Sequence, residues 1–260
     1  MNWAALDIII LGPAMLAGLL VIATHVPLGQ RVLERGIIFL DLAVAQVAGL
    51  GIIAAYSFHW EPGGWQVQVV AFGAAILTVL LLHYTERRWP EIQEALIGSL
   101  FVLASSGGIL LLSQNPHGGE HLKELLVGQI LWVDYKQLIP VAILYVLILG
   151  FWFSRRQQVN SLQFYLSFAL AITASVQLVG IYLVFASLII PALAIRAIKH
   201  RALAYGYVIG ILAYLSGLIL AALLDMPAGG MIVYSLAVLA LLFTYLAKRN
   251  ALHGNKTHES

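Results

Sequence analysis

Residues 162–195, LQFYLSFALAITASVQLVGIYLVFASLIIPALAI, form a tract of 34 positions without a single Asp, Glu, Lys, Arg or His. An α-helix needs about 20 mostly apolar residues to cross the hydrocarbon core of a bilayer. The tract therefore predicts membrane-embedded helix. Its length exceeds one span and falls short of two complete ones.

The rest of the chain resembles this tract in composition. Of its 260 residues, 61% are hydrophobic and 10% are charged, and the mean hydropathy is +0.92. Helices that are apolar on every side have no stable place in a soluble domain, and the apolar segments lack the alternation of membrane β-strands. We therefore expect an all-α, polytopic integral membrane helical bundle with about 8 transmembrane segments.

Further spans are expected wherever an apolar segment lies between charged or turn-forming residues. They fall near residues 7–25, 36–58, 67–84, 93–113, 139–153, 203–222 and 230–247. Residues 1–247 would then form a single transmembrane domain, and the polar residues 248–260 a disordered cytoplasmic tail. The N-terminus lacks the basic region and cleavage site of a signal peptide, so it is read as the first span.

The basic residues predict the orientation of the bundle. They lie in alternate connectors: Arg31 and Arg35, Arg87 and Arg88, Arg155 and Arg156, Lys199 and Arg201, and Lys248 and Arg249. The positive-inside rule places these connectors in the cytoplasm, with the N-terminus outside and the C-terminus inside. Tract 162–195 must then leave the cytoplasmic face and return to it, which predicts a broken or re-entrant pair with Gly180 and Pro191 as break points.

Two segments echo each other within the chain. LIGSLFVLAS at 96–105 and LVGIYLVFAS at 178–187 match at five of ten positions. In the predicted topology they run in opposite directions, as inverted repeats do in transporters. Chance similarity among apolar residues is the alternative.

Asp41 lies in the apolar stretch FLDLAVAQVAGLG, residues 39–51. A carboxylate at the centre of a membrane helix costs about 2.5 to 3.5 kcal/mol on insertion scales and is usually functional. A cation site here would combine Asp41 with neutral oxygens, such as backbone carbonyls near glycines and the hydroxyls of Ser105, Ser106 and Ser187. A structural role is the alternative: a pair with Arg35, or a hydrogen bond to a neighbouring helix.

Gln46 follows Asp41 by five residues. Five residues turn a helix by about 140° beyond one full turn, so the two side chains face one ion only if the helix is distorted. Packing between helices is therefore at least as good an interpretation of Gln46 as metal binding.

The eight histidines are all expected at the ends of spans or outside them. The segment HGGEH contains the one clustered set of donors, His117, Glu120 and His121. Imidazole and carboxylate groups suit first-row divalent metals, and the segment would lie on the outer face. It could receive an ion there, or it could be an ordinary solvated loop, because its spacing lacks the one-face pattern of helical metal sites.

The sequence lacks the common catalytic signatures. It contains no cysteine, no Gly-x-Ser-x-Gly elbow, no His-Glu-x-x-His motif and no P-loop. The chain is therefore not expected to be an enzyme or to hydrolyse ATP itself. If transport is active, the energy must come from a partner or from an ion gradient.

Five segments, taken in order, resemble the ABC-3 family, the membrane permeases of bacterial zinc and manganese ABC importers. They are ERGIIFLDLAVAQVAGLG (34–51), EALIGSLFVLASSGGILLLS (94–113), LKELLVGQILWV (122–133), VQLVGIYLVFASLIIPALAIR (176–196) and GLILAALLDMPAGGMIVYSLAVLAL (217–241). The similarity extends from about residue 12 to 245, and its strength lies in the order of the motifs.

The resemblance implies a multi-pass subunit of the bacterial inner membrane that carries Zn²⁺ or Mn²⁺ without holding a permanent cofactor. Its implied partners are a cytoplasmic ABC ATPase that binds ATP, an extracytoplasmic metal-binding protein, a second permease copy and the lipid bilayer, with no nucleic acid. It also places Asp41 on the metal path. The family pattern usually has a His four residues later, where this chain has Ala45 beside Gln46.

A second departure concerns contact with the ATPase. Family members usually carry a longer cytoplasmic segment before the Val-Gly motif, whereas this chain has only SRRQQVNS, residues 154–161. Either a shorter element contacts the ATPase, with Arg155, Arg156, Lys199 and Arg201 as the expected contacts, the last two within RAIKHR at 196–201, or coupling to the ATPase is altered.

Two other functions remain open. An ion-coupled secondary metal transporter would use Asp41 as its proton or cation carrier. A structural membrane subunit without a path would tolerate Asp41→Asn.

Overall fold

The computed structural model describes residues 8–56, 60, 64–113, 118–154, 160–198 and 200–256. In order along the chain, its helices are α1 (Ile8–Arg35), α2 (Leu40–Tyr56), α3 (Trp65–Arg88), η2 (Pro90–Ile92), α4 (Gln93–Leu112), α5 (Gly118–Val127), η3 (Ile130–Trp132), α6 (Tyr135–Ser154), α7 (Ser161–Val179), α8 (Ile181–Ile195), α9 (Ala202–Leu224) and α10 (Ala228–Lys256). The described chain contains no strand, so the predicted all-α membrane bundle is confirmed.

Seven of these helices are long and apolar enough to cross a membrane. They are α1, α3, α4 with η2, α6, α7, α9 and α10. The apolar helices α2 and α8 are shorter, with 17 and 15 residues. At 1.5 Å per residue, such helices fall short of a full span, so their ends lie inside the bundle or depend on adjoining segments.

The predicted break in tract 162–195 occurs at Gly180. This residue has φ +80° and ψ 163°, a backbone conformation that is essentially restricted to glycine. Its N–H donates to the carbonyl of Val176 at 2.9 Å and ends α7, while its carbonyl accepts from the N–H of Val184 at 3.1 Å and begins α8. Tract 162–195 is therefore two helices joined at one residue.

Pro191 is not a break point, contrary to the prediction. It lies inside α8, which continues to Ile195. A proline removes one backbone hydrogen bond, but a membrane helix tolerates this where neighbouring helices and local adjustments satisfy the freed carbonyl. The proline at position 27 of α1 is likewise inside a continuous helix.

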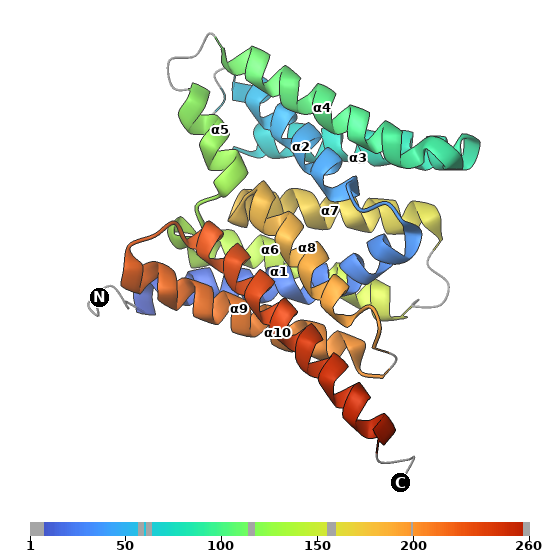
Figure 1. Ribbon diagram of the computed structural model, residues 1–260. Helices are drawn as coiled ribbons and strands as arrows, with labels where there is room; N and C mark the ends of the chain where they lie inside the picture. The colour runs from blue at the N-terminus through green and yellow to red at the C-terminus, as the bar shows by residue number, and fades with distance from the viewer. Residues whose placement is uncertain are drawn as a thin grey trace.

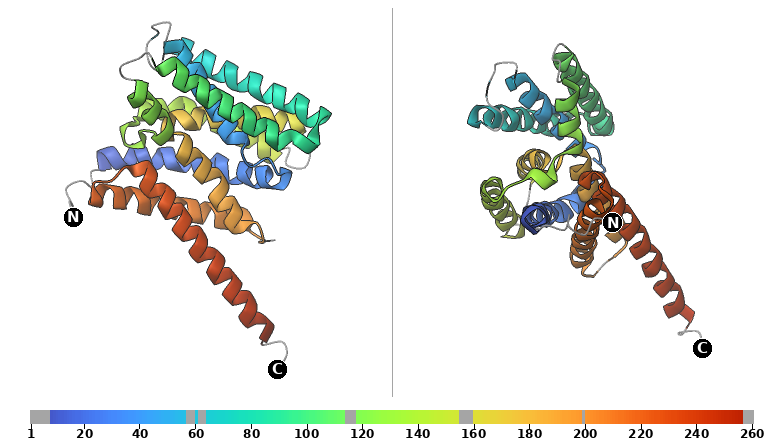
Figure 2. Two further views of the ribbon diagram at one scale, coloured as in Figure 1. Left: turned by 45° about the horizontal axis from the view of Figure 1, so that its top comes forward. Right: turned by 90° about the vertical axis from the view of Figure 1, so that its left-hand side faces the viewer.

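The helices form three layers that can be followed in Figure 1: α2, α3 and α4 on one side, α1, α6, α7 and α8 in the middle, and α9 with α10 on the other side. The right-hand view of Figure 2 looks nearly along α1 and α7 and shows them at the centre of the bundle. The apolar part of α7 is 67% buried, against 17% for α10. The core is therefore formed by α7 and α8 with the buried parts of α1 and α2, whereas α6, α4 and α10 present most of their apolar surface to lipid.

Small residues bring α1 and α9 close together. A Cβ on Gly206 would meet Val26 at 2.7 Å, and a Cβ on Gly210 would meet Ile22 at 2.6 Å. The ring of Tyr214 likewise occupies the space beside Gly18. Such approach through glycines is the usual way in which helices pack in lipid, where burial of apolar surface gives no driving force.

The successive helices alternate between two ends of the bundle. One end, here called the basic end, contains the C-terminal ends of α1, α3, α6 and α8 and the beginnings of α4, α7 and α9 (Figure 1). Arg35, Arg88 and Arg201 mark it. The opposite end contains α5 and the turn between α9 and α10. This grouping of basic residues at one end is the arrangement that the sequence predicted.

The two similar segments, residues 96–105 and 178–187, differ in structure. Residues 96–105 lie within continuous α4, whereas residues 178–187 include the break at Gly180. The segments do run in opposite directions, since α4 begins at the basic end and α8 ends there (Figure 1). The matching residues therefore do not specify the same local fold.

The C-terminal helix α10 continues to Lys256 and extends away from the bundle in both views of Figure 2. Residues 248–256 continue this helix in the structure, and the division into a transmembrane domain 1–247 and a disordered cytoplasmic tail 248–260 stays a prediction. Residues 257–260 lie outside the described chain.

Candidate functional site

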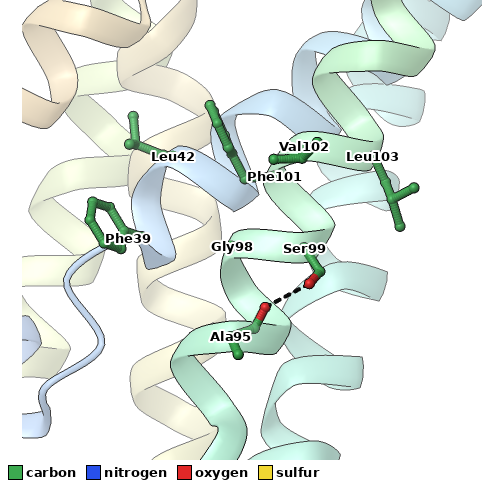
Figure 3. Close-up of a pocket in the computed structure, with 8 residues that line it drawn as sticks. All are labelled: Phe39, Leu42, Ala95, Gly98, Ser99, Phe101, Val102 and Leu103. Carbon is green, nitrogen blue, oxygen red and sulfur yellow. Dashed lines mark hydrogen bonds between the residues drawn. The ribbon is translucent and has the colours of Figure 1, made fainter.

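Asp41 lies in the first turn of α2 and not at the centre of a span, as the sequence had suggested. The difference arises because residues 36–39, inside the expected span 36–58, form a turn, so α2 begins only at Leu40. Gly36, with φ +70°, turns the chain between the two helices. The linker, residues 36–39, then leads directly into α2 at Phe39 (Figure 3).

The carboxyl group of Asp41 is buried. The residue is 1% exposed, and neither of its carboxylate oxygens receives a hydrogen bond from a described side chain. The first turn of a helix presents unpaired backbone N–H groups and a partial positive charge, which favour an acidic side chain there. Asp41 therefore has a local source of stabilisation but no side-chain partner, which leaves its oxygens available to a ligand.

Arg35 is not the partner of Asp41, as the structural alternative had proposed. Its Nη1 lies 3.3 Å from Oε1 of Glu86 on α3 and donates to Oγ of Ser161 on α7 at 3.0 Å. The Ser161 hydroxyl in turn donates to Oε2 of Glu86 at 2.5 Å. The Arg35 guanidinium also lies 4.5 Å from the centre of the Phe164 ring. Arg35, Glu86 and Ser161 are called the Arg35 network below.

The neutral side chains that were considered as further ligands of an ion at Asp41 differ in burial and in hydrogen bonding. Gln46 is buried within α2 at 8% exposure. The buried hydroxyl of Ser187 is 2.9 Å from that of Tyr214 on α9, so it is already paired. Among the residues that the structure describes, no three His, Asp or Glu side chains come together closely enough to hold a metal ion. Asp41 thus has no carboxylate or imidazole set around it within this part of one chain.

Of the three candidate ligands in HGGEH, residues 117–121, the structure describes the side chain of only one. Glu120 is an exposed residue in the first turn of α5, at the end opposite the basic end. His117 lies outside the described residues, as does the side chain of His121. The capture site therefore stays a prediction.

The expected ATPase contacts are also mostly outside the described chain. Arg155, Arg156 and Lys199 belong to the segments that the structure does not describe. Arg201 is exposed at the basic end, where it adopts a left-handed conformation with φ +58° immediately before α9.

His25 is a buried group that the sequence reading misplaced. It was expected at the end of a span, but it is 0% exposed in the interior of α1, and its Nδ1 lies 3.1 Å from the hydroxyl of Thr24. Its Nε2 has no hydrogen-bond partner within the described chain. The apolar residues that follow it, up to Leu28, were the signal that the helix continues, and Pro27 obscured that signal.

An apolar groove lies beside the beginning of α2 (Figure 3). It measures about 790 Å³ and is lined by Phe39, Leu42, Ala95, Gly98, Ser99, Phe101, Val102 and Leu103. The single hydroxyl in it, on Ser99, already donates to the carbonyl of Ala95 at 2.8 Å. The groove therefore suits an acyl chain or another helix and offers nothing to an ion.

At the end opposite the basic end, two glycines bring separate segments into contact. Gly128, with φ +72°, and Gly180 lie so close that a Cβ on either would overlap the backbone of the other. Gln68 of α3 donates to Gln177 of α7 at 2.6 Å in the same region. The segment after α5 is thus fixed against the break between α7 and α8.

Comparison with known proteins places this arrangement among membrane transport proteins. The manganese transport system membrane protein MntC of Halalkalibacterium halodurans is 24% identical over 248 residues, covering 86% of this chain and 83% of the relative. The high-affinity zinc uptake system membrane protein ZnuB of Haemophilus influenzae is 23% identical over 262 residues, covering 92% and 98%.

The fold has a counterpart among solved structures. A chain of PsaBC from Streptococcus pneumoniae, determined in complex with a Fab, superposes with a TM-score of 0.75 at 18% identity and covers 94% of this chain and 95% of that one. The ABC 3 transport family matches residues 7–247, nearly the whole chain. This multi-pass membrane protein therefore belongs to the ABC 3 transport family.

Proposed function

We propose that this chain is the permease subunit of an ATP-binding-cassette importer for a divalent transition metal, zinc or manganese. The observation that carries the proposal is Asp41, a buried acid without a side-chain partner in the described chain, in a family whose named relatives serve manganese and zinc uptake. Acidic groups inside membrane proteins usually face a path or a cavity.

In this function Asp41 is a transient ligand. A single carboxylate attracts a cation that has lost part of its hydration shell, but it does not complete the coordination that would trap the ion. Ala45, buried at 1% exposure, stands where the family pattern usually has a His, so it adds no imidazole. The remaining ligands would come from water, backbone carbonyls, Gln46 or a second copy of the chain.

The basic end would face the cytoplasm of a bacterial inner membrane, with the N-terminus outside. A cytoplasmic ABC ATPase would bind there, through Arg155, Arg156, Lys199 and Arg201, and ATP would bind to that partner. An extracytoplasmic metal-binding protein would deliver the ion near α5, where His117, Glu120 and His121 could receive it. Two permease copies would form the complete path. ATP binding and hydrolysis would shift the pair between two arrangements, each open to one side.

The runner-up is an ion-coupled secondary transporter. The same observation supports it, because a buried acid that lacks a partner can alternate between a proton and a metal ion. The two functions differ in their source of energy. The importer requires ATP on a partner, whereas a secondary transporter works alone on a pH gradient.

The test is copurification of the chain with a P-loop ATPase, followed by reconstitution of the complex into proteoliposomes. We expect ATP-dependent uptake of zinc or manganese and metal-stimulated ATP hydrolysis, both lost in Asp41→Ala and in Asp41→Asn. Asp225→Asn is the matched control, since Asp225 is an exposed acid in the turn before α10. Uptake by the chain alone on a pH gradient would replace the importer by the secondary transporter, and uptake unaffected by the Asp41 variants would remove Asp41 from the path.

A further inference from the structure

The Arg35 network joins three helix ends that are far apart in the sequence. Arg35 is the last residue of α1, Glu86 lies in the last turn of α3, and Ser161 is the first residue of α7. Each carboxylate oxygen of Glu86 accepts one hydrogen bond: Oε1 from Nη1 of Arg35 at 3.3 Å, and Oε2 from Oγ of Ser161 at 2.5 Å. A displacement of any one of these ends therefore strains or breaks contacts with the other two.

The linker that follows Arg35 is held at its other end as well. The backbone N–H of Phe39 donates to Oε1 of Glu94, in the first turn of α4, at 3.3 Å. Between these two anchors, Gly36 has φ +70°, and the N–H groups of Gly36 and Ile37 donate to carbonyls in the last turns of α1 at 3.2 and 3.3 Å. The linker is thus held at both ends and tied to α1, so a movement of Arg35 is passed along it to the beginning of α2.

The other side of the network is the beginning of α7. Asn160 caps this helix: its Oδ1 accepts from the N–H of Gln163 at 2.8 Å, and the Gln163 side chain accepts from the N–H of Asn160 at 3.3 Å. This reciprocal capping box fixes the angle at which the chain enters α7. Movement of Asn160 is therefore passed to Ser161 and is not absorbed by a frayed helix end.

We propose that Glu86 and Ser161 are positioning residues that link the beginning of α7 to the first turn of α2 and so to Asp41. The inference rests on the proposed function for its direction, in which the ATPase moves the beginning of α7. Displacing this helix end moves Ser161, which alters the contacts of Glu86 with Arg35 and displaces the linker at residues 36–39.

The strength of the network suits a reversible link. The side chains of Arg35 and Glu86 are 25% and 26% exposed, so solvent screens their attraction and the pair can break at modest cost. A fully buried pair would instead lock the three helices together, because separating it would leave an unpaired charge in a medium of low dielectric constant.

The test compares Ser161→Ala and Glu86→Gln with the wild type in proteoliposomes that contain the ATPase. Matched controls are Glu34→Gln, at an exposed glutamate that pairs with Arg31 at 2.9 Å, and Ser99→Ala, whose hydroxyl bonds only within α4. The readout is the amount of metal transported per ATP hydrolysed, because loss of linkage lowers this ratio whereas mere loss of stability lowers the amount of active complex.

We expect both network variants to lower the transported metal per ATP by about fivefold or more. Basal ATP hydrolysis and copurification of the ATPase should stay at the wild-type level, and both controls should couple normally. Normal coupling in Ser161→Ala and Glu86→Gln overturns the inference but leaves the proposed function intact. Absence of ATP-driven uptake in the wild type contradicts the proposed function itself.

A second measurement tests the positions directly and does not depend on transport. Because the chain contains no cysteine, the variant Leu42→Cys places a single thiol next to Asp41, on the groove of Figure 3. Glu86→Gln should change the rate at which a thiol reagent labels this cysteine, and Glu34→Gln should not. An identical rate in both backgrounds would show that the network does not position α2.

Discussion

The functional residue was predictable from the sequence because of its type, but its surroundings were not. An acid in an apolar stretch identifies Asp41 without any structure. Its obvious partner, Arg35, is nearest in sequence, yet Arg35 binds Glu86 and Ser161, which are 51 and 126 positions away. Contacts over such separations follow from how the helices pack, and a single sequence contains no direct record of that packing.

We expect Asp41→Asn to separate transport from stability. The amide has nearly the same shape as the carboxyl group and needs no counter-charge in a buried position, so the folded protein should be as stable as the wild type or more so. Metal uptake should fall by about tenfold or more, since an amide binds divalent cations more weakly than a carboxylate. Thermal unfolding in detergent and uptake in proteoliposomes measure the two effects. A large loss of stability would instead favour the structural role of Asp41.

Tyr214→Phe should affect stability without affecting transport. The Tyr214 hydroxyl is fully buried and lies 2.9 Å from that of Ser187, so it links α9 to α8. Hydrogen bonds between membrane helices contribute about 0.6 to 1.7 kcal/mol. We expect a slightly lower melting temperature and wild-type uptake per folded protein. Ser99→Ala, which removes a hydroxyl that bonds within its own helix, is the control.

At the scale of elements, the sequence predicted which segments are helical better than where they end. The break at Gly180 was predictable because glycine tolerates a positive φ and apolar tract 162–195 was too long for one span. Pro191 was a poor guide, since it lies inside a continuous helix, as Pro27 also does. Surrounding helices decide whether a proline ends a membrane helix, and the turn at residues 36–39 is what places Asp41 in the first turn of α2.

Gly180→Ala should disrupt the junction of α7 and α8. An alanine at φ +80° is strained, and its Cβ would overlap the backbone of Gly128, so we expect a loss of about 3 kcal/mol or more. Gly73→Ala is the matched control: Gly73 lies in α3, and a Cβ there meets nothing within 4 Å. The control should be neutral or slightly stabilising, because alanine favours helix. Thermal unfolding and yield of monodisperse protein in detergent distinguish them, and equal stability of the two variants would show that the glycine contact is dispensable.

At the scale of the molecule, composition predicted the membrane bundle and the distribution of Arg and Lys predicted which helix ends meet. Both properties are sums over many residues, so errors at single helix ends do not change them. The Arg35 network and the contact of Gly128 with Gly180 depend instead on a few atoms from distant segments. For that reason the orientation can be predicted and tested independently of the site.

The absence of cysteine makes the orientation directly measurable. Ser113→Cys places a thiol on the exposed turn after α4, at the end opposite the basic end, and Glu91→Cys places one on the exposed turn between α3 and α4. With the basic end in the cytoplasm, a membrane-impermeant thiol reagent should label Ser113→Cys in intact cells and Glu91→Cys only after permeabilisation. The unaltered chain, which has no thiol, is the control for background. The reverse pattern would place Arg88 and Arg201 outside the cell, and a cytoplasmic ATPase could then no longer act on the Arg35 network.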